Sequence, residues 1–419
     1  MEQLLEFDPF AAEVVADPYP WLEMLLLEGP VHWLESRQMF MVVGYESVSA
    51  VIRDSAVFSS RLGYAAQAKG AMSQGADVDM DKVVGFDISA LRQLISTDPP
   101  DHTRIRRLVS RAFSPRAVAE IEPRLRNACA ELISGLIANA GTGDADLMRD
   151  LAIPFPVVVI AELLGVSPDR RDDFRRWSDA LVGALSGNLD MDEAMAAGIE
   201  LVTFLTEAVE ERKVRPGDDL MSRLLASSSE SDPDTLTIDE VVANSLLFLA
   251  AGSETTTNLI ANAVAALAAH PDQTQQLFAN PEMLPAIIEE VLRWDSPVQG
   301  LFRGTTEPTT LAGVDLPEGS LVFVSFAAAN RDPSHFDQPD RFDITRNPKD
   351  HLAFGHGIHH CIGASLARLE VRLVFESLLG AGTALEPTDG VVRATSVFLR
   401  GFQRMPVTCA PLHGGRPHP

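Results

Sequence analysis

The chain has 419 residues, of which 46% are hydrophobic and 22% charged, and its formal net charge at pH 7 is −25. This length and composition allow a large hydrophobic core, whereas the acidic balance disfavours a nucleic-acid partner, because binding to phosphates depends on cationic side chains. We find no signal peptide and no run of about 18 uncharged apolar residues near the start. The three cysteines are scattered, as in a reducing compartment. These features predict a cytoplasmic protein without a membrane anchor.

The first predicted elements are a short helix and a β-hairpin. Residues 21–27 have a helical apolar pattern that is far too short for a membrane span, so we expect this helix to pack on the core. Strands are predicted over 31–34 and 39–43, with a turn at 36–38 between them. The stretch 61–90 that follows is long and rich in Gly, Ala and Asp.

A predicted helix after Pro99-Pro100 carries a histidine and an arginine. His102 and Arg106 are four residues apart and therefore share one helix face. Another arginine, Arg303, lies in a predicted extended segment farther along the chain. Taken alone, each of these cations would be an ordinary solvated side chain, because charged residues are mostly exposed.

The longest predicted helix begins after Thr237. Thr237 and Glu240 have the spacing of a capping box, and an apolar helical pattern continues to His270, where Pro271 ends it. The helix would therefore have about 32 residues and a length of about 48 Å, which is long for a soluble domain.

One face of this helix changes from leucine to two alanines and then to an acid and an alcohol. A flat group could lie against such a face, because the side chains narrow along it. The alternative is that the acid faces the surface and that the threonine hydroxyl bonds to the carbonyl four residues earlier. The residues of this face are Leu247, Ala250, Ala251, Glu254 and Thr255.

The next predicted elements are a helix with an ion pair and a second hairpin. Glu290 and Arg293 are three residues apart, a spacing that usually gives an exposed pair worth only a few tenths of a kcal/mol. A hairpin is predicted within 311–326, with its turn at 317–320.

A glycine-rich loop, Phe354-Gly-His-Gly-Ile-His-His-Cys361-Ile-Gly363, ends at the start of a predicted amphipathic helix over 364–375. The N–H groups and the dipole of a helix N-terminus favour a thiolate at Cys361. Gly355, Gly357 and Gly363 would allow tight turns and the close approach of a flat partner.

The residues alone leave three interpretations of Cys361 open. It could be a buried and inert thiol, as isolated cysteines usually are. It could bind zinc together with His356, His359 or His360, although the second half of a tetrahedral site is not apparent. It could also be the single axial thiolate of a haem iron, whereas an iron–sulfur cluster would need about four cysteines.

Together these motifs resemble those of cytochrome P450s. The run F-x-x-G-x-x-x-C-x-G, which ends at Gly363, resembles the haem-binding loop, and A-G-x-E-T-T, which begins at Ala251, is similar to the oxygen-activating segment. Glu290 and Arg293 resemble the family's E-x-x-R, whose partner in a P-x-R-F stretch would be Arg341. The resemblance extends over roughly residues 10–408 and favours the soluble bacterial type.

The resemblance implies a P450 fold, mainly α with small β-sheets, in which a haem lies between the long central helix and the cysteine loop. We expect a single domain over residues 1–419, because the motifs must meet at one cofactor and no linker separates them. Its folded part would span about residues 10–408, and residues 410–419 would form a disordered tail.

The resemblance also implies roles for individual residues. Cys361 would ligate the iron of haem b, and Glu254 and Thr255 would provide the proton path for the co-substrate O2. A buried network of Glu290, Arg293 and Arg341 would fix the cysteine loop. The residues implied to contact the haem are His102, Arg106, Arg303 and His359 at its propionates, and Ala251, Phe354, Gly357 and Gly363 elsewhere.

By the same resemblance, a substrate pocket would lie over the haem, capped by residues 61–90, and the loop at 185–191 would face the substrate. Its apolar lining predicts a hydrophobic small molecule, such as a terpenoid, steroid, fatty-acyl or polyketide-like compound. For any single lining residue, an ordinary place in the core is an equal alternative. The implied lining residues are Leu247, Ala250, Val298, Phe302 and Phe398.

The resemblance further implies a ferredoxin-type partner with an NAD(P)H-dependent reductase, because the chain has no flavin or pyridine-nucleotide segment. We expect a basic patch to attract this acidic donor. His360 stands where relatives commonly have an apolar residue, and we hypothesise that it adds charge to the patch. The other patch residues are Arg104, Arg106, Arg107, Arg111, Arg116, Arg368 and Arg372.

We therefore predict a haem-thiolate monooxygenase that inserts one atom of O2 into a hydrophobic small molecule. An H2O2-dependent peroxygenase is one alternative, which the intact Glu254-Thr255 pair disfavours. A non-catalytic haem- or ligand-binding protein is another, and a zinc hydrolase is a more distant one. Turnover with H2O2 alone, compared with turnover with NADH and ferredoxin partners, distinguishes the peroxygenase from the monooxygenase.

Overall fold

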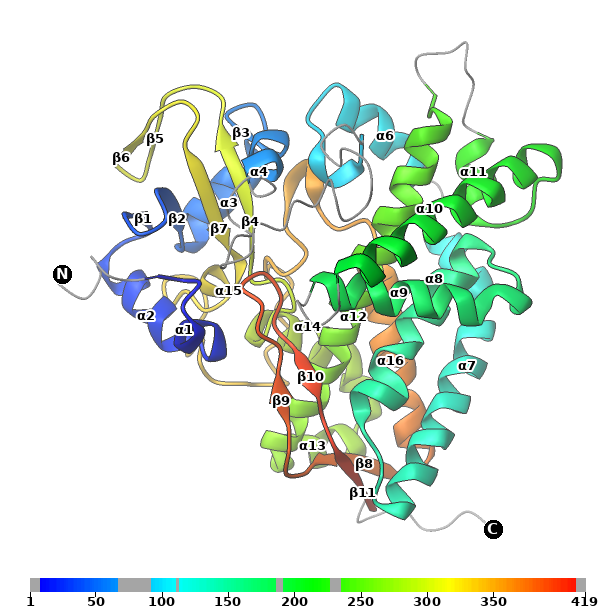
Figure 1. Ribbon diagram of the computed structural model, residues 1–419. Coiled ribbons are helices and arrows are strands. Elements are labelled where there is room, and N and C mark those ends of the chain that lie inside the picture. Colours follow the sequence, from blue (N-terminus) through cyan, green and yellow to red (C-terminus); the bar gives the residue numbers. More distant parts are fainter. Residues whose placement is uncertain (1–7, 67–91, 111–112, 186–190, 227–234, 412–419) are drawn as a thin grey trace.

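The computed structural model describes residues 8–66, 92–110, 113–185, 191–226 and 235–411. The protein is mainly helical, with the N-terminal strands on one side and the long helices on the other (Figure 1). The helices are α1 (Ala12–Ala16), α2 (Tyr19–Glu28), α3 (Tyr45–Arg53), α4 (Ser60–Ala66), α6 (Asp101–Ser110), α7 (Pro115–Thr142), α8 (Pro154–Leu164), α9 (Arg171–Leu185), α10 (Met191–Val214), α11 (Leu220–Leu225), α12 (Ile238–Ala269), α13 (Pro271–Ala279), α14 (Leu284–Trp294), α15 (Phe326–Ala329) and α16 (Ala364–Gly380).

The β-structure is small, as predicted. One five-stranded sheet has the order β1-β2-β7-β4-β3, and three two-stranded sheets accompany it. The strands are β1 (Val31–Leu34), β2 (Met39–Val42), β3 (Phe58–Ser59), β4 (Gly300–Thr305), β5 (Thr309–Leu311), β6 (Val314–Leu316), β7 (Leu321–Ser325), β8 (Thr383–Pro387), β9 (Val392–Arg393), β10 (Phe402–Arg404) and β11 (Val407–Pro411).

The hairpin predicted at the N-terminus is confirmed, whereas the pairing predicted for the second one is wrong. β1 and β2 pair antiparallel. In the second region β5 pairs with β6 through a turn at Ala312-Gly313, both at positive φ, and β7 pairs with β4 and β2 instead. Four of the five β7 residues are buried, so this strand gains more from the centre of the large sheet than from an exposed hairpin.

The long helix is confirmed from its first residue to its last. The Thr237 hydroxyl accepts the Glu240 N–H at 3.1 Å, and a Glu240 carboxylate oxygen accepts the Thr237 N–H at 2.9 Å, which completes the capping box. The helix α12 has 32 residues and ends before Pro271. It passes through the helical side of the molecule beside α8, α10 and α16 (Figure 1).

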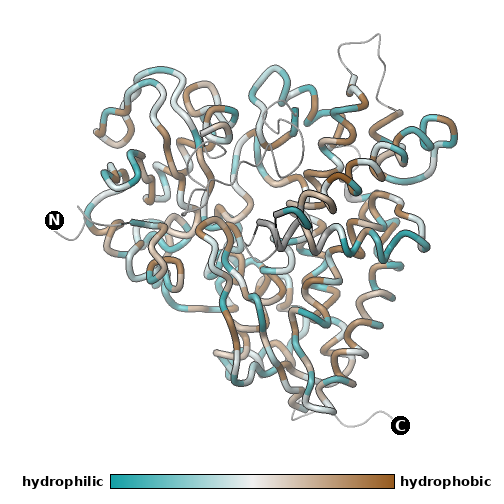
Figure 2. Tube along the Cα trace, viewed as in Figure 1, coloured by the Kyte–Doolittle hydropathy of each residue, from teal (hydrophilic) through white to brown (hydrophobic). Residues whose placement is uncertain are grey.

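Hydrophobic residues form three buried clusters. The largest holds residues of the helices from α6 to α14 and of α16. The second lies between the five-stranded sheet and α3, and the third lies beneath α1 and α2. Brown and teal segments alternate along most helices in Figure 2, as expected for helices with one face in a core.

The limits of the folded part differ slightly from the prediction. Ala410 and Pro411 pair in β11 with β8, so the tail predicted from residue 410 is wrong for its first two residues. Residues 412–419, most of the expected cap over 61–90 and most of the loop at 185–191 lie outside the described residues. Within the ranges that the structure describes, we find no helix that combines the length and apolar character of a membrane span.

Candidate active site

The cysteine loop is built by two glycines in the left-handed region. Gly355 and Gly357 have φ of 65° and 68°, a conformation that favours glycine. A Cβ atom on Gly357 would come within 2.7 Å of the Ile52 carbonyl oxygen on α3, so this glycine also permits close packing. Gly363 has an ordinary φ of −85° at the start of α16, so its backbone conformation alone does not require glycine.

Cys361 lies between this loop and the N-terminus of α16. Its N–H donates to the Phe354 carbonyl oxygen at 2.8 Å. The backbone N–H groups of Gly363 and Ala364 and the charges of Arg106 and Arg368 lower the pKa of the thiol, but burial is the largest influence and raises it overall. The helix N-terminus thus acts in the direction expected from the sequence, and burial acts against it. Coordination to a metal would further favour the anionic sulfur.

Cys361 is exposed, although the groups packed around its thiol raise its pKa. The predicted face of α12 has the same property, because Ala251 is exposed in a part of the helix where Phe248, Leu249 and Ser253 are buried. Accessible surface at these two places is what a cofactor between loop and helix would cover.

The acid and the alcohol on α12 have different environments. The Thr255 hydroxyl donates to the Ala251 carbonyl oxygen at 2.6 Å, the local bond that the sequence left open as an alternative. Burial raises the pKa of Glu254 to about 7. This carboxyl group can therefore bind and release a proton near neutral pH.

Four predicted cations, His102, Arg106, Arg303 and His359, lie close together; we call them the cation cluster. The rings of His102 and His359 have centroids 4.2 Å apart. Burial, followed by the charges of Arg303, His102 and Arg106, lowers the pKa of His359 to about 2. Burial and the neighbouring Arg106 lower the pKa of His102 to about 4. The structure thus brings together residues from three distant parts of the sequence.

No carboxylate of the described residues forms an ion pair with the cation cluster, although the charge of Asp98 acts on His102 and Arg303. Neither ring nitrogen of the buried His102 has a hydrogen-bond partner among the described residues. The buried Arg303 guanidinium donates to its neighbour's carbonyl, Phe302 O, at 2.7 Å, and burial lowers its pKa to about 10. Unpaired buried polar groups are unfavourable unless a ligand satisfies them. Two carboxylates of a haem would meet this requirement, so the residues fit the expected cofactor.

The histidines beside Cys361 do not form a zinc site. Among the described residues, no three His, Cys, Asp or Glu side chains gather in an arrangement that could hold a metal. His356 lies 3.4 Å from Arg53, and His359 lies 3.0 Å from the Ser60 hydroxyl. Burial and nearby cations lower the pKa of His360, which argues against a charged His360 in a docking patch at neutral pH.

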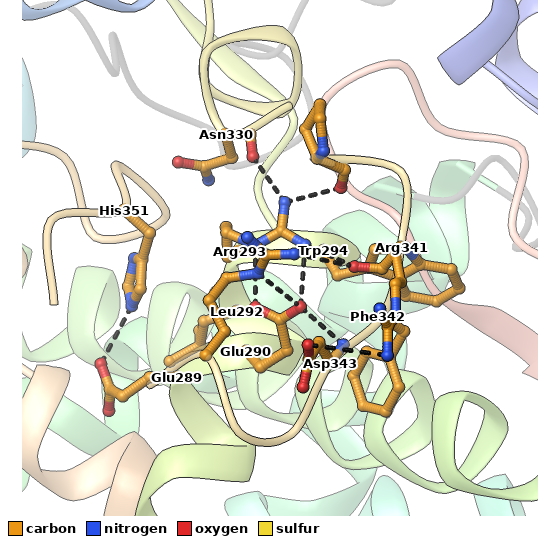
Figure 3. Close-up of polar contacts among 12 residues, drawn as sticks. Glu289, Glu290, Leu292, Arg293, Trp294, Asn330, Arg341, Phe342, Asp343 and His351 are labelled. Atoms are coloured by element: carbon orange, nitrogen blue, oxygen red, sulfur yellow. Dashed lines mark hydrogen bonds and ion pairs between the residues drawn. The ribbon is translucent and has the colours of Figure 1, made fainter. Parts of the chain in front are cut away.

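Glu290 and Arg293 on α14 form a fully buried ion pair (Figure 3). Two N–H groups of Arg293 donate to the two carboxylate oxygens, each at 2.8 Å. Its other N–H groups donate to carbonyl oxygens of Asn330, Pro339 and Arg341. All five donors of the guanidinium are used, which makes this pair a rigid connection between α14 and the segment that leads to the cysteine loop.

The third cation of this network is Arg346, not Arg341 as predicted. Arg346 Nε donates to Glu290 at 3.3 Å, and its side chain is 17% exposed. The Arg341 guanidinium is 64% exposed and lies 3.9 Å from Asp343, so only its backbone carbonyl joins the network. The sequence offers two arginines five residues apart, and only the course of the backbone decides which one reaches Glu290.

The predicted pocket residues divide into two groups. Leu247, Ala250, Val298 and Phe398 are partly exposed, as wall residues of a pocket would be. Phe302 is 3% exposed and packs edge-on against Phe323 in the N-terminal core, so for this residue the core interpretation is correct. The 298 and 398 segments lie side by side, because Gln299 N–H donates to Phe398 O at 2.8 Å.

The predicted basic patch is weaker than its sequence suggests. Arg104 is turned inward and forms a two-pronged ion pair with Glu240, at 3.0 Å for one prong. Arg116 pairs with Glu120, and Arg372 with Glu122 and Glu376. Arg111 lies outside the described residues. Neighbouring carboxylates thus neutralise much of the predicted patch.

Similarity to known proteins extends over most of the chain. The family model described as Cytochrome P450 matches residues 188–381. Cytochrome P450 107B1 of Saccharopolyspora erythraea is 44% identical over 335 residues, which cover 78% of this chain and 80% of that protein. Vitamin D(3) 25-hydroxylase of Pseudonocardia autotrophica is 45% identical over 323 residues, with coverages of 76% and 78%. The crystal structure of CYP109E1 from Bacillus megaterium with corticosterone is 34% identical, with a TM-score of 0.80 and coverages of 94% and 99%.

Proposed function

The chain belongs to the cytochrome P450 family, and we propose from this premise that it hydroxylates a hydrophobic molecule of the steroid or secosteroid class. It is a monooxygenase with a cysteine-ligated haem iron and with O2 as co-substrate. When bound, the haem supplies the chemistry of oxygen activation. The observations that carry the proposal are the exposure of Cys361 and of Ala251, together with the cation cluster, in which the buried His102 has no hydrogen-bond partner among the described residues.

Cys361 is the proposed iron ligand, because it is exposed, whereas Cys129 is buried and Cys409 is only partly exposed. His102, Arg106, Arg303 and His359 are proposed to hold the two propionates, since all four belong to the cation cluster. Ala251, Phe354, Gly357 and Gly363 would line the haem, while the Glu290 network fixes the loop.

Glu254 and Thr255 are proposed to hold and move the protons that the reaction consumes. The Glu254 carboxyl group, with a pKa raised to about 7, is protonated in part of the molecules at neutral pH. The Thr255 hydroxyl uses its proton on the Ala251 carbonyl, so its oxygen is left to accept a hydrogen bond. This oxygen can therefore accept a hydrogen bond from a proton donor on the cofactor side of the helix.

The substrate class follows from an apolar wall and from two relatives. Leu247, Ala250, Val298 and Phe398 offer aliphatic and aromatic surface with no charge. One similar protein is named for vitamin D(3), and the similar CYP109E1 was crystallised with corticosterone. Rigid polycyclic or secosteroid molecules bury much apolar area with little loss of conformational entropy on binding.

The proposal includes the surroundings of the enzyme. Bacterial relatives of this family use redox partner proteins, and a ferredoxin with an NAD(P)H-dependent reductase is the proposed partner here. A single cytoplasmic domain is proposed as well.

The test uses the purified haem-loaded protein. We expect the absorption band typical of a thiolate-ligated ferrous carbon monoxide complex, and a spin-state shift of the Soret band with vitamin D(3) or corticosterone but not with a sugar of equal mass. NADH, a ferredoxin and its reductase should give a product with one added oxygen. A protein without the thiolate band would contradict the assignment of Cys361, and turnover with H2O2 alone would favour a peroxygenase.

A further inference from the structure

Glu289, one residue before the Glu290 network, takes part in a separate set of contacts. Figure 3 shows its side chain directed toward His351 and away from Glu290. Arg368 on α16 forms a two-pronged ion pair with it, with Nε–Oε1 and Nη2–Oε2 distances of 2.6 and 2.8 Å. His351 Nε2 lies 3.0 Å from the same carboxylate. The carboxylate therefore joins α14, α16 and the segment before the cysteine loop.

The charges of this group follow from its hydrogen bonds. The Ala353 N–H donates to His351 Nδ1 at 3.3 Å, so Nδ1 carries no proton and Nε2–H donates to Glu289. Burial raises the pKa of Glu289, but the hydrogen bonds from Arg368 and His351 outweigh it and lower the pKa to about 2. Glu289 and Arg368 are therefore an ionised pair near neutral pH.

Arg368 also reaches the loop that holds Cys361. Its guanidinium carbon lies 4.6 Å from the centroid of the Phe354 ring, a cation–π arrangement. The carbonyl oxygen of the same Phe354 accepts the N–H of Cys361 at 2.8 Å. The positive charge of Arg368 acts on the Cys361 sulfur and favours its anionic form. A single side chain thus touches the residue that holds Cys361 and sets part of the field at its sulfur.

We propose that Arg368 is a positioning residue that raises the electrostatic potential at Cys361, and that Glu289 is the counter-charge that limits this effect. The inference rests on the proposed function, in which Cys361 ligates the haem iron. Through this pair, the contact between α14 and α16 sets how readily the bound iron accepts an electron.

Substitution of the two residues of the pair should shift the reduction potential of the iron in opposite directions. Glu289→Gln removes a negative charge and leaves the guanidinium without its counter-charge, so addition of an electron to the iron becomes more favourable. Arg368→Gln leaves a carboxylate without its cation, so the same step becomes less favourable. The double substitution removes both charges and should bring the potential back toward that of the unaltered protein. A merely structural role would instead give shifts of the same sign or a loss of haem.

The experiment is a spectroelectrochemical titration of the haem-loaded protein and its variants. At a fixed applied potential, the ratio of ferrous to ferric protein should rise about three- to fivefold in Glu289→Gln and fall by a similar factor in Arg368→Gln, as expected for one partly exposed charge. Arg368→Lys should have a reduction potential close to that of the unaltered protein, because lysine keeps the positive charge although it cannot form the two-pronged ion pair.

Arg372→Gln is the matched control. Arg372 lies one turn farther along α16, its side chain is 36% exposed like that of Arg368, and its carboxylate partners within the described chain are Glu122 and Glu376. Its substitution should leave the potential unchanged. Shifts of one sign in both Gln variants, or an equal shift in the control, would overturn the inference. Absence of the thiolate carbon monoxide band in the unaltered protein would instead overturn the proposed function.

Discussion

Two regions of this molecule bury charge in opposite ways. Around Glu290 the charged groups are saturated, since all five Arg293 donors and both carboxylate oxygens have partners in the chain. In the cation cluster, neither ring nitrogen of the buried His102 has a hydrogen-bond partner, and the buried Arg303 guanidinium forms no ion pair with a carboxylate of the described residues. The comparison suggests that saturated buried charge fixes the fold, whereas unsaturated buried charge marks the place of a ligand.

The two regions should therefore respond differently to the cofactor. A charge that the chain satisfies stabilises the protein whether or not haem is present. A charge that the chain leaves unpaired destabilises the haem-free protein and becomes favourable when an anionic ligand binds. This difference can be tested by substitution in each region.

The largest expected effect comes from Arg293→Ala. It leaves the Glu290 carboxylate buried with little compensation and removes three further bonds to the segment before the cysteine loop. We expect a loss of about 3–5 kcal/mol in the free energy of unfolding, with and without haem. Urea denaturation of both forms measures it. A loss confined to the haem-bound form would contradict the structural role of the network.

A second prediction concerns Arg303→Leu in the cation cluster. Because the variant no longer buries a guanidinium that forms no ion pair, its haem-free form should be at least as stable as the unaltered protein. Its haem affinity should fall about tenfold or more, since a charge-assisted hydrogen bond to a propionate is lost. Thermal unfolding of the haem-free form and transfer of haem to apomyoglobin measure the two effects.

Arg212→Leu provides the control for this substitution. Arg212 has a similarly buried guanidinium but is paired with Asp219 at 2.8 Å. Its loss should destabilise both forms and leave haem transfer unchanged. If Arg303→Leu destabilised the haem-free form as strongly as Arg212→Leu, the distinction between saturated and unsaturated charge would fail.

A third prediction uses the pH dependence of Glu254. Its pKa is raised from 4.5 to about 7, so the folded protein binds more protons than the unfolded chain within this window. Glu254 therefore lowers stability as pH rises from about 4.5 to 7. We expect Glu254→Gln to gain about 1–2 kcal/mol over the unaltered protein between pH 5 and pH 8, reduced by partial exposure. If the free energies of unfolding of the two proteins changed with pH in parallel, the pKa of Glu254 would not be raised in the folded protein.

Much of this architecture could be predicted from local sequence signals. The capping box and Pro271 fixed both ends of α12, because helix caps act within a few residues. The four members of the cation cluster could be named because a family resemblance supplied their roles, since their separate positions in the sequence gave no such signal.

What the sequence could not provide depends on long-range geometry. The strand predicted to pair with β7 was wrong. A strand pairs where its side chains become buried, and the turn before the strand does not determine that place. The Glu289–Arg368 pair was missed because its members lie 79 residues apart. No spacing rule connects residues at such a distance.

The smallest expected effect separates two arginines that the sequence could not distinguish. Arg341→Ala should change the free energy of unfolding by less than about 0.5 kcal/mol, because its guanidinium is 64% exposed and only weakly paired with Asp343. Arg346→Ala should cost about 1 kcal/mol or more, because this side chain reaches the buried Glu290 and also donates to Asp337 O at 2.6 Å. Chemical denaturation under identical conditions compares them. A larger loss of stability in Arg341→Ala than in Arg346→Ala would mean that Arg341 enters the network in solution. Arg341, as the sequence first suggested, would then be the third partner of Glu290.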